Sequence, residues 1–292
     1  MALRGRLRSN IALAAYTTWR IGGPAKQVYQ PADTQDLCDF LSQLPQNEAL
    51  LFLGLGSNTL IRTGGFAGTV VLTQGRLNNM VLLNDTQIRV EAGVACPLLA
   101  RFCARQALQG AEFLAGIPGT LGGALRMNAG CQGQAIWALV TAVETINRQG
   151  QLTKWPRAAW QIAYREVCMP PDEWFVAAEL RLQAGSKAQS LEIIRQLLAH
   201  RARTQPTHQP SCGSVFRNPP QAYAGELIER CGLKSKQIGG AMISPKHANF
   251  IVNTGHATST DIERLMQQII DTVRKTHHIQ LIPEVHIIGC AR

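Results

Sequence analysis

The sequence predicts an α+β fold. Segments with the pattern of hairpins and of helices are mixed along the 292 residues, without the regular strand–helix alternation of a parallel α/β sheet. The length suggests two or three domains with an ample core. Near residue 185 the hairpin-like segments give way to amphipathic helices, which places a domain boundary there.

The first predicted elements are a helix, a strand and a hairpin. A helix is expected over 32–44, with Asp33 as its N-cap. An apolar strand follows within 49–58 and leads into a glycine turn, and residues 80–93 indicate a hairpin that bends at Asn84–Asp85. The apolar face of the helix repeats at helical spacing: Leu37, Phe40, Leu41 and Leu44.

The middle of the chain predicts a helix, a second hairpin and a strand. Pro97 can occupy the first turn of a helix. Residues 138–155 predict a hairpin turning at Gln149–Gly150, and residues 175–183 predict a strand. The helix after Pro97 carries these apolar residues: Leu98, Leu99 and Phe102.

The last third of the chain predicts two helices and a closing strand. An amphipathic helix is expected over 190–204, followed by a loop at 205–216. A longer helix is expected over 260–277 and a strand within 284–289. The stripe of the longer helix consists of Ile262, Leu265, Met266, Ile269, Ile270 and Val273.

Composition and charge limit the function classes. Hydrophobic residues make up 46% and charged residues 16% of the chain, which is typical of a globular protein. No apolar run approaches the ~20 residues of a membrane span, and the apolar run Ile11–Tyr16 is too short for a signal peptide. The net charge of +10 is dispersed, so it indicates a solvated basic surface or a cleft for phosphorylated small molecules rather than nucleic-acid binding.

The cysteines and histidines indicate no metal site. The eight cysteines are scattered and form no CxxC pair, and the histidines show no zinc-ligand spacing. Without an export signal, these cysteines are expected to be reduced thiols in the cytoplasm.

Two glycine-rich segments stand out. The first, Gly54 to Asn58, follows the predicted strand, but Thr59 replaces the third glycine of a Rossmann fingerprint. The second, "GIPGTLGGALRMNAG" at 116–130, has five glycines, with Asn128 as an amide donor or acceptor. Backbone N–H groups in glycine turns can bind anions, so the pair suggests a dinucleotide, although either segment alone could be an ordinary turn.

Eight motifs give the sequence a specific resemblance. They are "YTTWRIGGPA" (16–25), "LGLGSNTLI" (53–61), "GIPGTLGGALRMNAG" (116–130), "YR" (164–165), "GSVFRNP" (213–219), "AGELIERCGLK" (224–234), "KHANFIVN" (246–253) and "PEVHIIG" (283–289). In this order they resemble the UDP-N-acetylenolpyruvoylglucosamine reductase (MurB) family, in its shorter type II subgroup.

The resemblance implies three domains and a flavin. A two-subdomain FAD-binding region of the p-cresol methylhydroxylase type would cover 1–75 and 76–185, with a C-terminal α+β substrate domain at 186–292. FAD would be non-covalent, because no histidine lies in or next to either glycine loop. The residues implied to hold FAD are Gly54, Gly56, Ser57, Asn58, Gly116, Ile117, Pro118, Gly119, Gly122 and Gly123.

The resemblance also implies a reaction. NADPH would reduce FAD, and the enolpyruvyl double bond of UDP-N-acetylenolpyruvoylglucosamine would then be reduced to give UDP-N-acetylmuramate for peptidoglycan, by a cytoplasmic monomer. Arg165 would stabilise the enolate-like carboxylate, and Ser214 would donate the proton to carbon. Glu284 would be the third catalytic residue. The implied substrate-binding residues are Tyr164, Arg217 and Asn218.

The sequence departs from the family pattern at two positions. Val167 stands where a serine is usual, and Arg217 stands where lysine is common. The alternatives are a related flavin oxidase with another substrate, and a hydrolase using Ser214 or Cys212 with one of two histidines, although no GxSxG elbow is present. Those histidines are His208 and His247.

Overall fold

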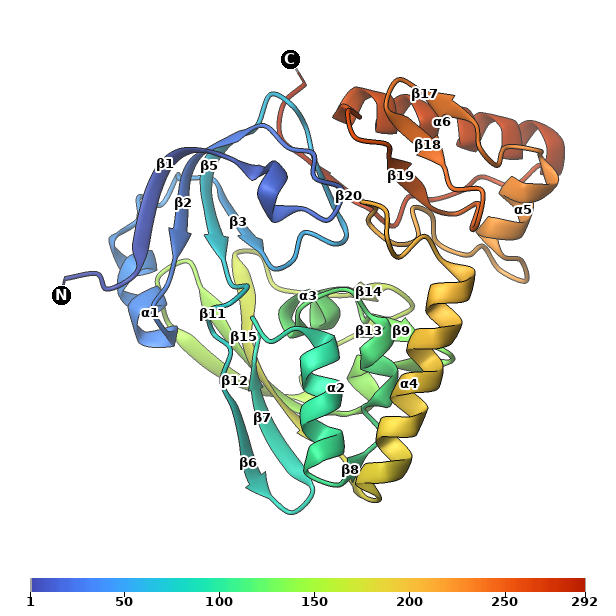
Figure 1. The fold of residues 1–292 in the computed structure, drawn as a ribbon. Helices are drawn as coiled ribbons and strands as arrows, with labels where there is room; N and C mark the ends of the chain where they lie inside the picture. Colours follow the sequence, from blue (N-terminus) through green and yellow to red (C-terminus); the bar gives the residue numbers. More distant parts are fainter. Residues whose placement is uncertain (1, 292) are drawn as a thin grey trace. The chain divides into compact units, whose positions relative to one another are not determined.

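The computed structural model describes residues 2–291, which fall into two compact units (Figure 1). Unit 1 consists of the stretch up to Ser9, Gln27–Leu55 and Gly68–Ala199. Unit 2 consists of Asn10–Lys26, Gly56–Ala67 and the stretch from His200 onward. The domain limits expected from the sequence, 1–75, 76–185 and 186–292, remain a prediction.

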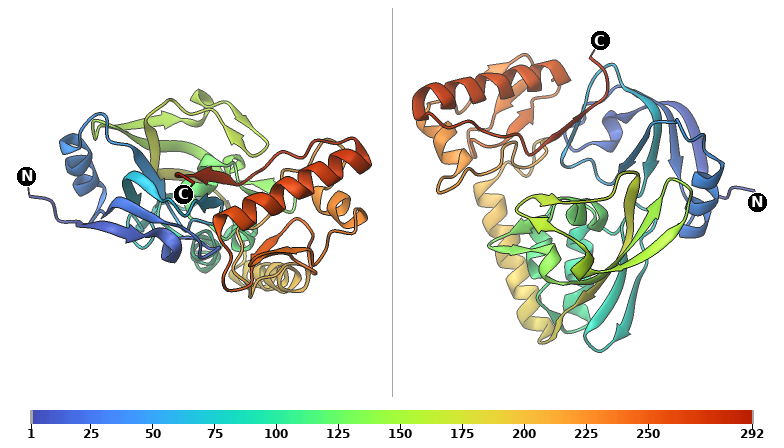
Figure 2. Two further views of the ribbon diagram at one scale, coloured as in Figure 1. Left: turned by 90° about the horizontal axis from the view of Figure 1, so that it is seen from above. Right: turned by 180° about the vertical axis from the view of Figure 1, so that it is seen from behind.

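Unit 1 contains a five-stranded antiparallel sheet in the order β12-β11-β15-β7-β6. Figure 2, right, shows this sheet from behind. Its strands are β6 (Met80–Asn84), β7 (Gln87–Glu91), β11 (Val140–Asn147), β12 (Leu152–Pro156) and β15 (Glu173–Arg181).

Helices α2 (Cys96–Arg105) and α3 (Leu121–Arg126) cover one face of this sheet, with the 3-10 helix η2 (Glu112–Gly116) (Figure 1). Their apolar residues form one core with sheet residues such as Ile88 and Leu180. Helix α4 (Lys187–Thr204) follows. Further 3-10 turns and short paired strands complete this part of the chain: η3 (Ile136–Ala138), η4 (Arg157–Ala159), β8 (Leu108–Gln109) with β16 (Gln183–Ala184), β9 (Gly130–Cys131) with β10 (Gln134–Ala135), and β13 (Ile162–Ala163) with β14 (Glu166–Val167).

A second sheet has the order β1-β2-β5-β3, in which β3 and β5 are parallel. Helix α1 (Thr34–Gln43) buries Leu37, Phe40 and Leu41 in a core with Tyr29, and the Asp33 side chain caps it by accepting from Asp36 N, as predicted. The strands of this sheet are β1 (Arg6–Ala12), β2 (Pro24–Gln30), β3 (Leu50–Leu53) and β5 (Phe66–Leu72).

Unit 2 is built around helix α6 (Ser259–His277). The predicted apolar stripe of this helix is buried, and Thr258 and Asp261 form a capping box at its start. Trp19, from the N-terminal part of the chain, is fully buried in the same core and donates from Nε1 to Ile251 O (2.7 Å). The other elements are η1 (Leu13–Tyr16), β4 (Thr59–Ile61) parallel to β20 (His286–Ile288), α5 (Ala224–Arg230), and the sheet of β17 (Gln237–Ile238), β18 (Ala241–Ile243) and β19 (Ile251–Asn253).

The α+β prediction is confirmed, with local corrections. The first hairpin turns at Asp85–Thr86, one residue later than predicted, because Asn84 still pairs with Gln87 and its Oδ1 accepts from Thr86 N. Leu98 is 54% exposed, so it is not part of the buried face of α2. None of the helices within residues 2–291 is long and apolar enough to cross a membrane.

Candidate active site

Unit 1 brings Gly54, the first residue of the first glycine-rich segment, next to the second segment. Gly54 lies at the end of β3, and a Cβ atom there would collide with the Thr120 hydroxyl. Thr120 is buried and is the N-cap residue of α3, in the middle of the second segment. The sequence separates these residues widely, so their close approach depends on the tertiary fold.

The glycines of the second segment face different neighbours. A Cβ on Gly122 would lie 3.0 Å from Ala92 Cβ, and Gly122 N donates to Ala92 O (2.9 Å). A Cβ on Gly116 would lie 3.1 Å from Cys131 Sγ. Around Gly123 the nearest atom is Thr120 Oγ1, at 3.9 Å from the Cβ position. Gly116 and Gly122 therefore permit packing within the protein, whereas Gly123 leaves an open backbone surface.

The backbone between these glycines is fixed by short-range hydrogen bonds. Gly119 N donates to Ile117 O (2.9 Å), and Gly119 O accepts from Cys96 N at the start of α2 (2.8 Å). Pro118 lies between Ile117 and Gly119 and is half-buried. The segment is thus a rigid loop that enters α3.

Gly56, Ser57 and Asn58 belong to unit 2. Gly56 has a positive φ of 58°, and a Cβ there would collide with Tyr16 O. Asn58 donates from Nδ2 to Glu284 O (3.0 Å), and His286 N donates to Asn58 O (3.0 Å). Asn58 therefore holds the backbone of the predicted catalytic glutamate, while its role toward a cofactor remains a prediction.

Arg165 lies in the tight turn between β13 and β14. Its φ is +56°, a left-handed conformation that costs a non-glycine residue on the order of 1 kcal/mol. The guanidinium donates to Asn128 O (3.3 Å) and Gly130 O (3.0 Å), and Cζ lies 5.2 Å from the centroid of the Tyr164 ring. The turn thus directs the Arg165 side chain to the end of the second glycine-rich segment. The neighbouring Tyr164 remains 54% exposed.

Two neighbours stabilise the arrangement around Arg165. The Asn128 amide donates to Ala163 O (3.0 Å), at the start of the same turn. Val167, which stands where the family has a serine, is buried and accepts at its carbonyl from Arg126 Nη1 (3.1 Å). Valine at 167 therefore packs into the core of unit 1.

Unit 2 brings Ser214 and Glu284 onto neighbouring segments. Glu284 N donates to Val215 O (2.8 Å), and Arg217 N donates to Ile282 O (2.9 Å). Ser214 and Glu284 are both half-buried. The sequence predicted both as catalytic residues, and the backbone pairing brings their segments together.

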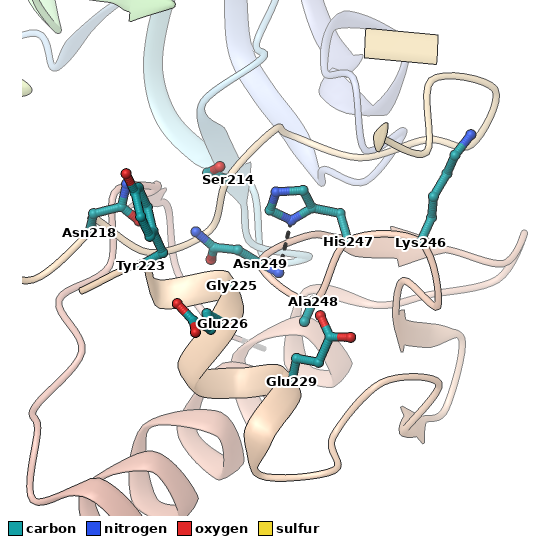
Figure 3. Close-up of a pocket in the computed structure, with 10 residues that line it drawn as sticks. All are labelled: Ser214, Asn218, Tyr223, Gly225, Glu226, Glu229, Lys246, His247, Ala248 and Asn249. Atoms are coloured by element: carbon teal, nitrogen blue, oxygen red, sulfur yellow. Dashed lines mark hydrogen bonds between the residues drawn. The ribbon is translucent and has the colours of Figure 1, made fainter. Parts of the chain in front are cut away.

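A pocket of about 400 Å³ opens beside Ser214 (Figure 3). Figure 3 shows Asn218 and Tyr223 at one end and His247 with Lys246 at the other, with the Lys246 side chain directed away. Asn218 Oδ1 accepts from Ala224 N (3.0 Å), so this residue also fixes the start of α5. The lining residues are Ser214, Asn218, Tyr223, Gly225, Glu226, Glu229, Lys246, His247, Ala248 and Asn249. Arg217 is not among them.

The charge state of Cys212 does not support a thiol nucleophile near this pocket. Burial, with a smaller contribution from the charge of Glu284, raises the pKa of Cys212 well above its usual value. Burial also lowers the pKa of His247, whose Nδ1 accepts from Asn249 N (3.2 Å). Cys212 is therefore a protonated thiol at neutral pH, which disfavours the hydrolase alternative that uses it.

Comparisons with known proteins identify the family. A family model described as "UDP-N-acetylenolpyruvoylglucosamine reductase, C-terminal domain" matches residues 205–288. A UDP-N-acetylenolpyruvoylglucosamine reductase from Legionella pneumophila (strain Corby) is 57% identical over 99% of this chain and 94% of its own length. The chain belongs to the UDP-N-acetylenolpyruvoylglucosamine reductase family.

Other members of this family match this chain in sequence and in structure over nearly its whole length. The protein of that name from Nitrosococcus oceani is 53% identical over 99% of this chain and 97% of its own length. The crystal structure of the reductase (MurB) from Thermus caldophilus has a TM-score of 0.84 and 30% identity, covering 99% of this chain and 100% of that one. The family resemblance inferred from the eight motifs is confirmed.

A second family model, "FAD binding domain", matches residues 25–155 and confirms the predicted FAD-binding fold. The residues present fit a flavin nucleotide. The Gly54–Thr120 contact joins the two glycine segments, and the open backbone at Gly123 offers a surface without side chains beside them. Unit 1 can therefore hold the cofactor along this backbone.

Several residues of the Ser214 pocket were not predicted from the sequence. Tyr223, Glu226, Glu229 and Asn249 were given no role, and His247 was named only as a partner in the hydrolase alternative. All of these except Tyr223 lie within the motifs "AGELIERCGLK" and "KHANFIVN", so the motifs marked the right segments. Which side chains of a motif face a pocket is decided by tertiary packing, which the motif does not encode.

Proposed function

We propose that this chain is an NADPH-dependent flavoenzyme that reduces UDP-N-acetylenolpyruvoylglucosamine to UDP-N-acetylmuramate, in the synthesis of peptidoglycan precursors. Identity of 57% over 99% of the chain to a reductase of that name carries this proposal. The pairing of the Ser214 and Glu284 segments adds support, because the reaction needs a proton donor beside an anionic substrate.

The substrate is an enol ether that carries a carboxylate. The glycine segments would hold FAD, which would supply the chemistry for moving a hydride from NADPH to the terminal carbon of the double bond. Negative charge then develops on the adjacent carbon and spreads into the carboxylate. One proton on that adjacent carbon completes the reduction.

Arg165 stabilises the carboxylate in this scheme. A guanidinium remains charged and presents donors in a planar fork that matches two carboxylate oxygens. Its backbone is held in a strained turn, and its side chain is fixed by two carbonyl groups. Such fixed geometry is what transition-state stabilisation requires. Tyr164, which is next to it and exposed, contributes to substrate binding.

Ser214 donates the proton to carbon. A serine hydroxyl is a weak acid, so it acts only when held close to a strongly basic carbon. Glu284 helps as a protonated acid beside the anionic substrate. Arg217 and Asn218, which follow Ser214 in the chain, bind the substrate, and the positive charge of Arg217 suits its diphosphate.

The eight cysteines are free thiols, which fits the proposal that the enzyme acts in the cytoplasm. We also propose that it is a monomer, and light scattering during size-exclusion chromatography tests this.

NADPH consumption tests the proposed function. Flavin-loaded protein is mixed anaerobically with NADPH, with and without UDP-N-acetylenolpyruvoylglucosamine. Continued NADPH oxidation should require the nucleotide, and UDP-N-acetylmuramate should accumulate in equal amount. In a parallel sample under air, turnover that depends on oxygen and ignores the nucleotide would instead identify the related oxidase.

A further inference from the structure

Asn249 holds the backbone that follows Ser214. Its side chain makes two hydrogen bonds to one residue: Oδ1 accepts from Phe216 N (3.0 Å), and Nδ2 donates to Phe216 O (2.9 Å). Its own carbonyl accepts from Val215 N (2.9 Å). Asn249 and Phe216 are 3% and 1% exposed, so water does not replace these bonds.

Only an amide side chain satisfies this arrangement. Phe216 presents one N–H donor and one C=O acceptor, and a carboxamide supplies one acceptor and two donors in a single plane. An apolar residue would leave two buried backbone groups unpaired, and a carboxylate would have no donor for the carbonyl. The pair of bonds therefore fixes the path of the chain at 216.

Ser214 depends on this fixation because its neighbour on the N-terminal side, Gly213, has no side chain to hold the backbone. Gly213 precedes it with a φ of +81°, and no atom lies within 4 Å of the position that its Cβ would occupy. Farther back, Ser211 bridges to Val252. The bonds of Asn249 are therefore the nearest side-chain restraint on the C-terminal side of Ser214.

We propose that Asn249 is a positioning residue for Ser214: its two hydrogen bonds to Phe216 hold the serine hydroxyl where it delivers the proton. The inference rests on the proposed function. A shift of ~1 Å in a reacting group can cost about 100-fold in rate, so a side chain without contact to the substrate carbon can control proton transfer.

Asn249→Ala tests the proposal when the two half-reactions are followed separately by stopped-flow absorbance. Flavin reduction by NADPH should stay within about threefold of wild type, because it needs no proton at the substrate carbon. Flavin reoxidation by UDP-N-acetylenolpyruvoylglucosamine should slow on the order of 100-fold. In a Ser214→Ala background, Asn249→Ala should cause almost no further slowing, because both changes remove the same step.

Asn249→Asp adds a readout that a purely structural role would not give. Its carboxylate keeps an acceptor for Phe216 N but cannot donate to Phe216 O. A protonated carboxyl group restores that donor. Burial raises the pKa of a carboxyl group, so reoxidation relative to wild type should recover as the pH falls below neutrality. This variant also supplies the comparison if Asn249→Ala does not fold.

Asn253→Ala is the matched control. Asn253 is a buried asparagine on the neighbouring strand β19, but its amide donates to Trp19 O (2.9 Å) and accepts from Gly255 N and Ala257 N. It should lower the melting temperature and leave reoxidation near the wild-type rate.

Three outcomes would overturn the inference: wild-type reoxidation in Asn249→Ala, equal slowing in Asn253→Ala, or undiminished slowing in the Ser214→Ala background. Failure of the wild-type protein to reoxidise with the nucleotide would instead reject the proposed function.

Discussion

Substitution by valine should have different effects at two adjacent glycines: it should lower thermal stability at Gly122 and FAD affinity at Gly123. A Cβ on Gly122 would lie 3.0 Å from Ala92 Cβ and 3.3 Å from Ala92 O. Carbon atoms in contact prefer about 3.5–4.0 Å, so Gly122→Val forces a shift of roughly 0.5–1 Å before its two methyl groups are placed. Overpacking of this kind costs about 1–3 kcal/mol. The melting temperature should fall by roughly 2–4 °C for each kcal/mol.

Gly123→Val should leave the FAD-free protein intact. The Cβ position there has no atom nearer than Thr120 Oγ1 at 3.9 Å, and valine exceeds glycine in helix propensity by a few tenths of a kcal/mol. If FAD lies against this backbone, the valine methyl groups occupy its place. FAD affinity should then fall at least about tenfold, which corresponds to ~1.4 kcal/mol.

Two measurements on FAD-free protein separate these effects: thermal unfolding, and titration with FAD followed by flavin fluorescence. Gly122→Val should melt earlier, and Gly123→Val should melt with the wild type but bind FAD weakly. Wild-type FAD affinity in folded Gly123→Val would refute the assignment of this backbone to the cofactor.

Three further predictions concern the serine, the flavin and acid stability. Ser214→Ala should leave flavin reduction by NADPH nearly intact and slow reoxidation by the nucleotide on the order of 10²–10⁴-fold. Ser214→Cys should recover part of the reoxidation rate. Equal slowing of both steps in stopped-flow traces would show that the residue is structural. The protein should purify yellow and release its flavin on acid precipitation, whereas flavin that stays with the pellet would indicate a covalent link. Burial raises the pKa of Asp36, but hydrogen bonds from Tyr29 Oη (2.6 Å), Ala32 N (2.9 Å) and Arg4 N (2.6 Å) outweigh burial and hold that pKa below its usual value. The stability that Asp36 contributes is thus present above the ordinary Asp pKa of about 3.9 and lost as the pH falls through the lower folded value. Asp36→Asn should flatten this acid dependence in urea unfolding, and an unchanged slope would show that other carboxylates cause it.

Elements with a strong local pattern were predictable. The stripe of α6 and the Asp33 cap of α1 depend on residues within a few positions of each other, and both are confirmed. The turn at Asp85–Thr86 was misplaced by one residue, because asparagine can end a strand as well as begin a turn. Leu98 is exposed, which shows that the apolar residues of a short helix do not all face the core.

Long-range contacts could not be predicted in the same way. Strand β4 pairs with β20 through Thr59 and His286, which are far apart in the chain. The bonds from Asn249 to Phe216 also join separate segments, and "KHANFIVN" gives no local sign of them. Motifs located the segments of the site, whereas the contacts between those segments depend on the assembled core.

The burial of Trp19 in unit 2 has a consequence for synthesis on the ribosome. The indole donates to Ile251, 232 residues later in the chain. At about 5–20 residues per second, roughly 10–50 s pass between the emergence of the tryptophan and that of its acceptor. Throughout that interval the indole lacks its native acceptor and the part of its core that is contributed by residues after 200. Unit 2 therefore cannot complete its core co-translationally until its last strands leave the exit tunnel, and a fragment that begins at residue 200 should not fold independently.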